Sequence, residues 1–253
     1  MDLPVTRTVA SHLEVLSEAG STNAVLNEHA ADAGVWPHLS VVVTDNQTAG
    51  RGRLDRSWIA PPGASLAVSV LLRRLPAADV RGWIPLAAGV AMADAIADQL
   101  PDHTVAVKWP NDILVDGRKI CGILAQATTD AVIVGTGINT AMVSAELPVP
   151  TATSFAVLGV EADADRLLAT YLHRLDVLLG ELTAAGDAVS SGLHSSASER
   201  CATIGLDVAV SLPGDRTLVG EATALDAEGR LVVASGGVEH TVSAGDVVHV
   251  RPA

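Results

Sequence analysis

The chain has 253 residues, of which 49% are hydrophobic and only 2% aromatic. This length suits one large domain with a small one, and the core must consist mainly of Ala, Val, Leu and Ile. The formal net charge of −13 disfavours binding to nucleic acid, although a local basic patch can still bind the phosphates of a small ligand.

The cysteines and the hydrophobic pattern indicate in which compartment the protein resides. Cys121 and Cys201 stand far apart and outside any CxxC pattern, which indicates reduced buried thiols rather than a zinc site or a disulfide. The N-terminus lacks a signal-peptide pattern. Uncharged runs such as Ser57–Leu72 contain Pro and Gly and fall short of a span of about 18 apolar residues. We therefore expect a soluble, cytoplasmic protein that does not bind membranes.

The first two thirds of the chain predict a mixed sheet with helices. Short apolar and β-branched runs predict strands at His12–Leu16, Ser40–Thr44, Ala64–Leu72, Val105–Trp109, Ile113–Val115, Lys119–Gln126 and Ala131–Ile138. Helical spacing predicts helices from an N-cap at Ser21 to about Ala33, over Leu86–Leu100 after Pro85, and over Asp163–Leu182. The segment Asn46–Pro62, rich in Gly, Arg and Pro, is expected to be a long functional loop.

The last third changes character. The small polar segment Ala184–Ser198 is the best candidate for a linker. Beyond it, turns such as Pro213-Gly214-Asp215 and Ala244-Gly245-Asp246 separate five expected strands: Val208–Leu212, Leu218–Asp226, Arg230–Ser235, Val238–Val242 and Val247–Val250. This spacing predicts a small β-barrel or sandwich. We expect an α+β fold with domains at 1–199 and 200–253.

The first chemical motif is Gly50-Arg51-Gly52-Arg53-Leu54-Asp55-Arg56-Ser57-Trp58. Its glycines allow close approach of the backbone to a ligand, and arginine forks suit phosphate and carboxylate oxygens. A solvated basic loop is the alternative. No Gly-Lys-Ser/Thr follows, so the string is not a Walker A loop.

The second motif is Lys108-Trp109-Pro110-Asn111-Asp112, at the end of an apolar strand. Proline prevents regular pairing there, so a cation, an amide and a carboxylate stand together at a strand break. Lys108 can neutralise phosphate, and Asn111 or Asp112 can hold Mg²⁺ or a hydroxyl. An ordinary polar turn is the alternative.

Two further strings lie on neighbouring expected strands. Strict alternation over Arg118–Leu124 places Lys119 on one face with Cys121 and Ile123, where a core residue is expected. A solvated edge lysine is the alternative. The string Gly135-Thr136-Gly137-Ile138-Asn139 lacks the third glycine of a dinucleotide-binding fingerprint.

In this order and spacing, the strings resemble the biotin protein ligase family from Ser21 to Pro252. The resemblance rests on Ser21-Thr22-Asn23, Gln47-Thr48-Ala49-GRGR, Trp58, KWPND, RKICGIL, GTGIN and Ala244-Gly245-Asp246-Val247-Val248. It implies a class II synthetase-like biotin/lipoate ligase fold followed by a small SH3-like barrel. Lipoate protein ligases share the fold, but GRGR and KWPND together point to biotin.

The resemblance also implies residue roles. Catalytic roles fall to Lys119, Arg53 and Lys108. Biotin contacts are implied for Ser21, Thr22, Asn23, Gln47, Gly50, Arg51, Arg53, Lys119, Gly122 and Gly137. ATP contacts are implied for Arg51, Arg53, Trp58, Lys108, Asn111 and Asn139, and Mg²⁺ contacts for Asn111 and Asp112.

The implied reaction joins biotin and ATP to biotinyl-5′-AMP and passes biotin to a lysine of a carboxyl carrier domain. Cations and Mg²⁺ offset the repulsion between carboxylate and α-phosphate, and a closed loop protects the anhydride from water. We expect a monofunctional enzyme, monomeric or weakly dimeric, that does not bind DNA, because only a short segment precedes Ser21. A transcription repressor and a biotin-storage protein are the alternatives.

Two features depart from the family pattern. Leu54-Asp55 stands where many members carry Arg-Gly, which lowers the positive charge of the loop. No tryptophan follows Trp109, so the sequence does not identify a platform for adenine.

Overall fold

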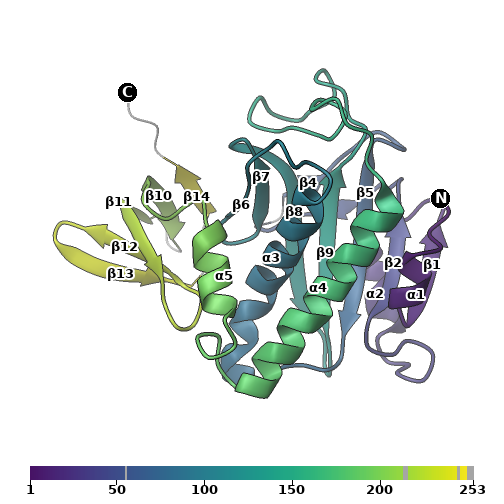
Figure 1. The fold of residues 1–253 in the computed structure, drawn as a ribbon, viewed down its shortest axis with the longest axis horizontal. Helices are drawn as coiled ribbons and strands as arrows, with labels where there is room; N and C mark the ends of the chain where they lie inside the picture. Colours follow the sequence, from purple (N-terminus) through teal and green to yellow (C-terminus); the bar gives the residue numbers. More distant parts are fainter. Residues whose placement is uncertain (55, 213–215, 244–245, 250–253) are drawn as a thin grey trace.

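A mixed seven-stranded sheet forms the centre of the larger domain (Figure 1). The computed structural model describes residues 1–54, 56–212, 216–243 and 246–249. The strand order is β1 (His12–Leu16), β2 (Ser40–Thr44), β5 (Ser65–Leu72), β9 (Val132–Asn139), β8 (Arg118–Ala127), β7 (Asp112–Val115) and β6 (Val105–Lys108). Only the β1–β2 pair is parallel among these described strands. Every strand expected here is present.

The two faces of the sheet carry different helices. Helices α3 (Ile84–Ala97) and α4 (Ala164–Ala185) pack on each other and cover one face (Figure 1). Helix α2 (Thr22–His29) packs against β2, β5 and β9 from the other, and α1 (Thr6–Val9) packs against α4. Along β5, Val68 and Val70 join the large core under α3 and α4, while Leu71 joins a smaller core under α2. Strand alternation therefore turns Ser69 toward α2.

Helix α3 begins two residues earlier than expected, with Pro85 in its first turn, and ends three residues earlier. A 3₁₀ turn, η1 (Ala78–Trp83), leads into it. Together they form a stretch, Ala78–Ala97, whose length and apolarity would suffice to cross a bilayer, but 72% of its most apolar window is buried inside the protein. It packs as the central core helix.

Two segments that the sequence predicts to be irregular contain regular structure. The expected linker at 184–198 overlaps helix α5 (Leu193–Arg200), which forms because Leu193 and Ala197, four residues apart, are both buried against the core. The expected loop at 46–62 contains a small hairpin of β3 (Gly50–Arg51) and β4 (Ser57–Trp58). Helix α2 also ends at His29, earlier than the sequence indicates.

The C-terminal part, where the sequence predicts a small β-barrel or sandwich, forms a small antiparallel sheet. Its order is β13 (Val238–Val242), β12 (Leu231–Ser235), β11 (Arg216–Leu225), β10 (Asp207–Leu212) and β14 (Asp246–His249). Over the described residues this sheet is open, with β13 and β14 as its edges, rather than a closed barrel. The expected turns at 213–215 and 244–245, and the last residue of the expected strand Val247–Val250, lie outside the described residues.

Two tryptophans dock this sheet onto the larger domain. The indole Nε1 of Trp83 donates to the carbonyl of Ala227 at 2.9 Å, and that of Trp109 donates to the carbonyl of Gly229 at 3.0 Å. Both indoles are almost fully buried. The turn between β11 and β12 is therefore held at two points, one of them inside the KWPND motif.

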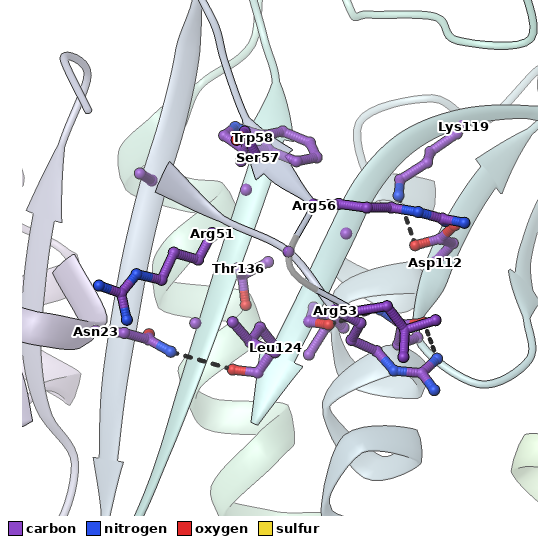
Figure 2. Close-up of a pocket in the computed structure, with 18 of the residues that line it drawn as sticks. Asn23, Arg51, Arg53, Arg56, Ser57, Trp58, Asp112, Lys119, Leu124 and Thr136 are labelled. Atoms are coloured by element: carbon purple, nitrogen blue, oxygen red, sulfur yellow. Dashed lines mark hydrogen bonds and ion pairs between the residues drawn. The ribbon is translucent and has the colours of Figure 1, made fainter. Parts of the chain in front are cut away.

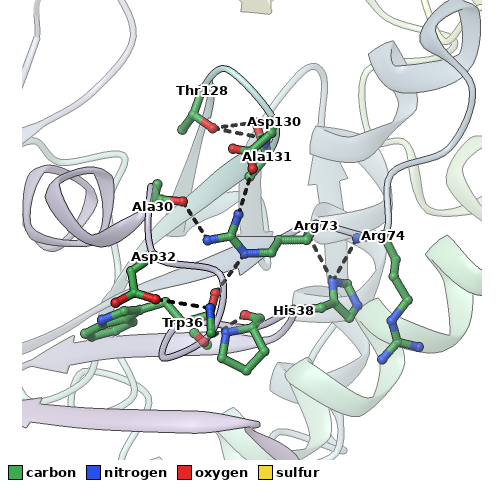
Figure 3. Close-up of polar contacts among 12 residues, drawn as sticks. Ala30, Asp32, Trp36, His38, Arg73, Arg74, Thr128, Asp130 and Ala131 are labelled. Atoms are coloured by element: carbon green, nitrogen blue, oxygen red, sulfur yellow. Dashed lines mark hydrogen bonds and ion pairs between the residues drawn. The ribbon is translucent and has the colours of Figure 1, made fainter.

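Arg73, at the end of β5, fixes the far end of α2 (Figure 3). Its guanidinium donates to the carbonyls of Ala30 at 2.6 Å and Trp36 at 2.8 Å and pairs with Asp130 at 3.1 Å. The ring Nδ1 of His38 accepts from the backbone N–H of Arg73, at 3.1 Å.

His38 is held in its neutral form. Its Nδ1 also accepts from the N–H of Arg74 at 3.3 Å, and its Nε2 lies 2.9 Å from Asp176. A proton on Nδ1 would face two donors. Burial also lowers the pKa of His38 below its ordinary value.

Candidate functional site

A cleft of about 150 Å³ lies on the α2 face of the sheet, under the β3–β4 hairpin (Figure 2). It collects residues from widely separated stretches of the chain. They are Ser21, Thr22 and Asn23 of α2 and its cap; Gln47, Arg51–Leu54 and Arg56–Trp58 of the hairpin region; Ala67 of β5; Lys108–Asp112, Lys119 and Gly122–Leu124; and Gly135–Gly137, with Val247 of the small sheet.

Glycines on β8 and β9 make the floor of one half of the cleft. A Cβ on Gly137 would overlap the indole of Trp58, and a Cβ on Gly122 would come within 3.3 Å of the same ring. A Cβ on Gly135 would overlap the side chain of Asn23. The sequence identified Gly122 and Gly137 but missed Gly135, which lies in the same GTGIN string. These positions let a flat group lie directly on the backbone.

The start of α2 forms the polar end of this half. Gln47 Oε1 accepts from the backbone N–H of Thr22 at 2.9 Å and lies 3.2 Å from the hydroxyl of Thr22. Ser21 caps the helix in extended conformation and also lines the cleft. The structure thus brings together Ser21, Thr22 and Gln47, three of the residues for which the resemblance implies biotin contacts.

Asn23 turns away from the ligand space. Its Nδ2 donates to Gln126 Oε1 at 2.6 Å and weakly to the carbonyl of Leu124 at 3.4 Å, and its Oδ1 lies 2.6 Å from Ser69 Oγ. Both ends of the amide are therefore engaged inside the protein. Ser69 was missed by the sequence analysis, although a lone polar residue within the apolar run Leu66–Leu72 is a detectable signal.

Lys119 reaches the cleft because β8 carries an irregularity. Ile113 pairs with Cys121, but Leu114 pairs with Lys119, so Ile120 is an extra residue on β8. This bulge reverses the side-chain alternation. The expectation that Lys119 shares a face with Cys121 and Ile123 is therefore wrong.

The bulge separates a reactive face from a core face. Lys119 lines the cleft with Gly122 and Leu124, whereas Cys121 joins the core. Ile123 belongs to the core and also borders the cleft. Cys121 is fully buried, and burial raises the pKa of its thiol above the ordinary value, which favours the protonated form.

Lys119 sits between two partners, Asp112 and Trp58. Its Nζ pairs with Asp112 at 2.7 Å and lies 5.8 Å from the centre of the Trp58 ring. The buried Nε1 of Trp58 finds no hydrogen-bond acceptor among the described residues. A buried donor without a partner costs free energy. We therefore expect an acceptor on a bound molecule to form a hydrogen bond with the Trp58 Nε1.

The hairpin is fastened to the KWPND turn. Arg53 Nη1 donates to Asn111 Oδ1 at 2.9 Å, and Asn111 Nδ2 donates to the carbonyl of Ile123 at 2.7 Å. Figure 2 shows Arg51 directed toward α2, while Arg53 and Arg56 extend to the side of Asp112. The three arginines therefore serve both halves of the cleft.

Charge in the cleft opposes that of the whole chain. Arg51, Arg53, Arg56, Lys108 and Lys119 contribute five cations, and Asp112 is the one carboxylate among the described lining residues. Such a cleft attracts and holds an anionic ligand, although the protein carries a formal charge of −13.

Asn111 and Asp112 offer an amide oxygen and a carboxylate side by side in sequence. The described residues contain no group of three or more His, Cys, Asp or Glu arranged to hold a metal. Mg²⁺, however, often takes one or two protein oxygens and completes its shell with substrate phosphates and water. The donor set therefore fits Mg²⁺ that arrives with a nucleotide.

Two residues from the implied set lie outside the cleft lining. Asn139 is buried at the end of β9 and donates from Nδ2 to the carbonyl of Thr153 at 2.9 Å. Gly50 is buried beneath Gln47 and the backbone of Trp58. Both support the walls of the cleft.

Comparisons with known proteins agree on one kind of protein. Residues 18–139 match the Biotin/lipoate A/B protein ligase family, and residues 203–250 match the Biotin protein ligase C terminal domain. The biotin--[acetyl-CoA-carboxylase] ligase of Mycobacterium tuberculosis is 38% identical over 94% of this chain and 89% of its own length. The bifunctional ligase/repressor BirA of Bacillus spizizenii is 36% identical over 56% of this chain, which spans 45% of that protein.

A solved structure shares the fold over almost the whole chain. The biotin protein ligase from Aquifex aeolicus in complex with biotin and ATP aligns with a TM-score of 0.79 at 24% sequence identity. The alignment covers 96% of this chain and 100% of that one. The small sheet and the larger domain are thus both part of the shared architecture.

Proposed function

The chain belongs to the biotin protein ligase family, and from that premise we propose that it is an ATP-dependent ligase that forms biotinyl-5′-AMP and passes biotin to a lysine of a carrier protein. One observation carries this proposal. Lys119 stands where the glycine-floored half of the cleft, beside Gly122, meets the KWPND half, beside Asp112. A carboxylate in the first half and a phosphate in the second would meet at this ammonium.

The cleft suits the first step of the reaction. A biotin carboxylate oxygen attacks the α-phosphorus of ATP, a P–O bond forms, and pyrophosphate leaves. Lys119, Arg53 and Lys108 offset the repulsion between the two anions and the charge of the transition state. Bound Mg²⁺, held by Asn111 and Asp112, would add charge neutralisation on the phosphates.

The second step needs a protected intermediate. The acyl carbon of the mixed anhydride is attacked by the carrier lysine amine, a C–N bond forms, AMP leaves and the amine loses a proton. The hairpin covers the cleft through the contact between Arg53 and Asn111, which excludes water from the anhydride until the carrier docks.

We propose biotin contacts for Ser21, Thr22, Gln47 and Arg51 and for the glycine floor. The sequence grouped Trp58 with the ATP site, but its ring lies over Gly122 and Gly137, so we assign it to the biotin half. Lys108 and Asn111 are proposed to hold ATP phosphates. We assign Asn139 to support because it lies outside the cleft lining, and Asn23 to support because both ends of its amide are held by residues behind the cleft.

The family suggests the partner protein, the compartment and the oligomeric state. The Mycobacterium relative is named for acetyl-CoA carboxylase, and we propose a biotin carboxyl carrier domain of such an enzyme as the partner. We also propose a cytoplasmic ligase that acts without binding DNA, as a monomer or weak dimer. Domains 1–199 and 200–253 are proposed to meet at the end of α5.

Incubation with biotin, MgATP and a carrier domain, followed by intact mass measurement, tests the function. A ligase adds one biotin to the carrier and releases AMP. Biotin-dependent pyrophosphate release without carrier separates the ligase from a biotin-storage protein, which would bind biotin and release none. Absence of both products from folded protein would refute the proposal.

A further inference from the structure

A row of residues with very small side chains crosses the floor of the cleft. In register across the sheet, Ala67 of β5 pairs with Gly137 of β9, which pairs with Gly122 of β8. Gly122 in turn pairs with Asp112 of β7. Directly paired residues lie on the same face of a sheet, and all four line the cleft. From β5 to β8 this floor row therefore offers a ligand only one methyl group and two glycines.

The neighbouring row on the same face is filled by side chains. Two residues further along the strands, roughly 7 Å away, Ser69 pairs with Gly135, and Gly135 pairs with Leu124. The side chain of Asn23 takes the space over Gly135, where a Cβ would overlap it. The open space therefore runs across the strands, along the floor row.

The two ends of the floor row differ in chemistry. At one end, a Cβ on Gly122 would lie 3.1 Å from Lys119 Nζ, so a carboxylate at this end meets the ammonium. At the other end, Ala67 is paired on its far side with Thr44 of β2, which precedes Gln47 by three residues. Gln47 belongs to the polar end of the cleft, for which we propose contacts with the ureido ring.

The length of the floor row matches the proposed ligand. Two strand spacings of about 4.8 Å separate Ala67 from Gly122, which gives about 10 Å in all. This length is close to the reach from the bicyclic ring of biotin to its carboxylate when the valerate chain is extended. The indole of Trp58 lies over Gly137 and Gly122. The wide ring therefore fits best over Ala67, and the narrow chain can pass beside the indole toward Lys119.

We propose that Ala67 is a specificity-determining residue whose small side chain admits the second ring of biotin. Its methyl group is buried at the bottom of the cleft, with a residue exposure of 3%, so a larger side chain at this position takes space from a bound ring. A urea with a single ring needs less of this space. The inference rests on the proposed function, which supplies biotin as the ligand, and adds a residue to which the family resemblance gave no role.

Desthiobiotin is the matched ligand for a test, because it keeps the ureido ring and a carboxylate chain but lacks the second, sulfur-containing ring. Calorimetry gives the Kd of biotin and of desthiobiotin for the wild type and for Ala67→Val. The two added methyl groups should crowd the bicyclic ring more than the single ring. The ratio of the biotin Kd to the desthiobiotin Kd should therefore rise at least about tenfold in Ala67→Val, which corresponds to about 1.4 kcal/mol.

Two further variants control the test. Ala64→Val makes the same change at a buried alanine outside the cleft lining, and it should leave the Kd ratio unchanged. Ala67→Cys adds a single sulfur atom and should raise the ratio by a smaller amount. It carries the test if urea unfolding shows that Ala67→Val does not fold.

A loss of affinity by one common factor for both ligands, or no loss for either, would show that the second ring does not lie over Ala67 and would overturn the inference. An equal rise of the Kd ratio in Ala64→Val would overturn it as well. A folded wild type that binds neither biotin nor desthiobiotin would instead refute the proposed function.

Discussion

Replacing Trp109 by Phe tests whether the small sheet helps to hold the ATP half of the cleft. Trp109 lies between Lys108 and Pro110 in the cleft lining, and its Nε1 donates to the carbonyl of Gly229 in the turn between β11 and β12. Its backbone N–H also donates to Thr203 Oγ1, at 3.1 Å, just before the small sheet begins. The KWPND turn is thus tied to the small sheet on two sides.

The magnitude follows from the burial of this contact. Trp109 is 2% exposed, so Trp109→Phe leaves the Gly229 carbonyl buried without its donor, at a cost of about 1–3 kcal/mol. The smaller ring also loses packing worth on the order of 1 kcal/mol. We expect a fall of about 2–4 kcal/mol in the free energy of docking the small sheet. If a third to a half of this loss of free energy is felt at the Lys108–Asn111 turn, the KM for ATP rises about tenfold, which corresponds to about 1.4 kcal/mol.

Trp83→Phe is the matched control. Trp83 is 0% exposed and donates to the carbonyl of Ala227 in the same turn, but it lies on η1, outside the cleft lining. Both variants should lose similar stability in urea unfolding, while Trp109→Phe alone should raise the KM for ATP with little change in the Kd for biotin. Equal changes in ATP KM in the two variants, or none in either, would refute the reasoning.

Three other perturbations probe the proposed machinery. Lys119→Ala should slow biotin-dependent pyrophosphate release about 10²–10³-fold. It should leave folding nearly intact, because the ion pair between Lys119 and Asp112 is partly exposed. An unchanged rate would remove Lys119 from the mechanism. Arg53→Gly should unfasten the hairpin and let the adenylate escape, so that mass spectrometry finds biotin on lysines of bystander proteins; strict specificity or complete inactivity would contradict this gating role. Burial lowers the pKa of His38 in the folded protein below its ordinary value. At pH values between the two pKa values, the unfolded chain therefore binds more protons than the folded one. The free energy of unfolding falls as the pH drops through this interval. His38→Gln should flatten the pH dependence of the free energy of unfolding, measured by urea titration between about pH 7.5 and pH 5. An unchanged pH dependence would show that the proton is taken up elsewhere. His249 is one such site, since its pKa is lowered by burial and by the nearby charge of Lys108.

The sequence by itself determined the strands, the domain order and the chemical strings. Buried β-branched runs such as Ser40–Thr44 predict strands because a sheet covered on both faces requires continuous apolar sequence, and this strand occurs at the predicted bounds. GRGR and KWPND were recognisable because their chemistry is local, with cations, glycines and a proline within a few residues. The same local rules misjudged 184–198, where helix α5 gains most of its stability from burial against the core.

Only the tertiary structure decided which way the functional side chains point. One extra residue, Ile120, turns Lys119 from the core face to the cleft, and strand alternation cannot foresee a bulge that depends on pairing with β7. Asn23 turns inward because Ser69 and Gln126, 46 and 103 residues away, meet it across the sheet. The tie from Trp109 to Gly229 likewise spans 120 residues. Such contacts follow from register and domain docking, which no window of sequence contains, so the sequence named the reacting groups and the fold set their geometry.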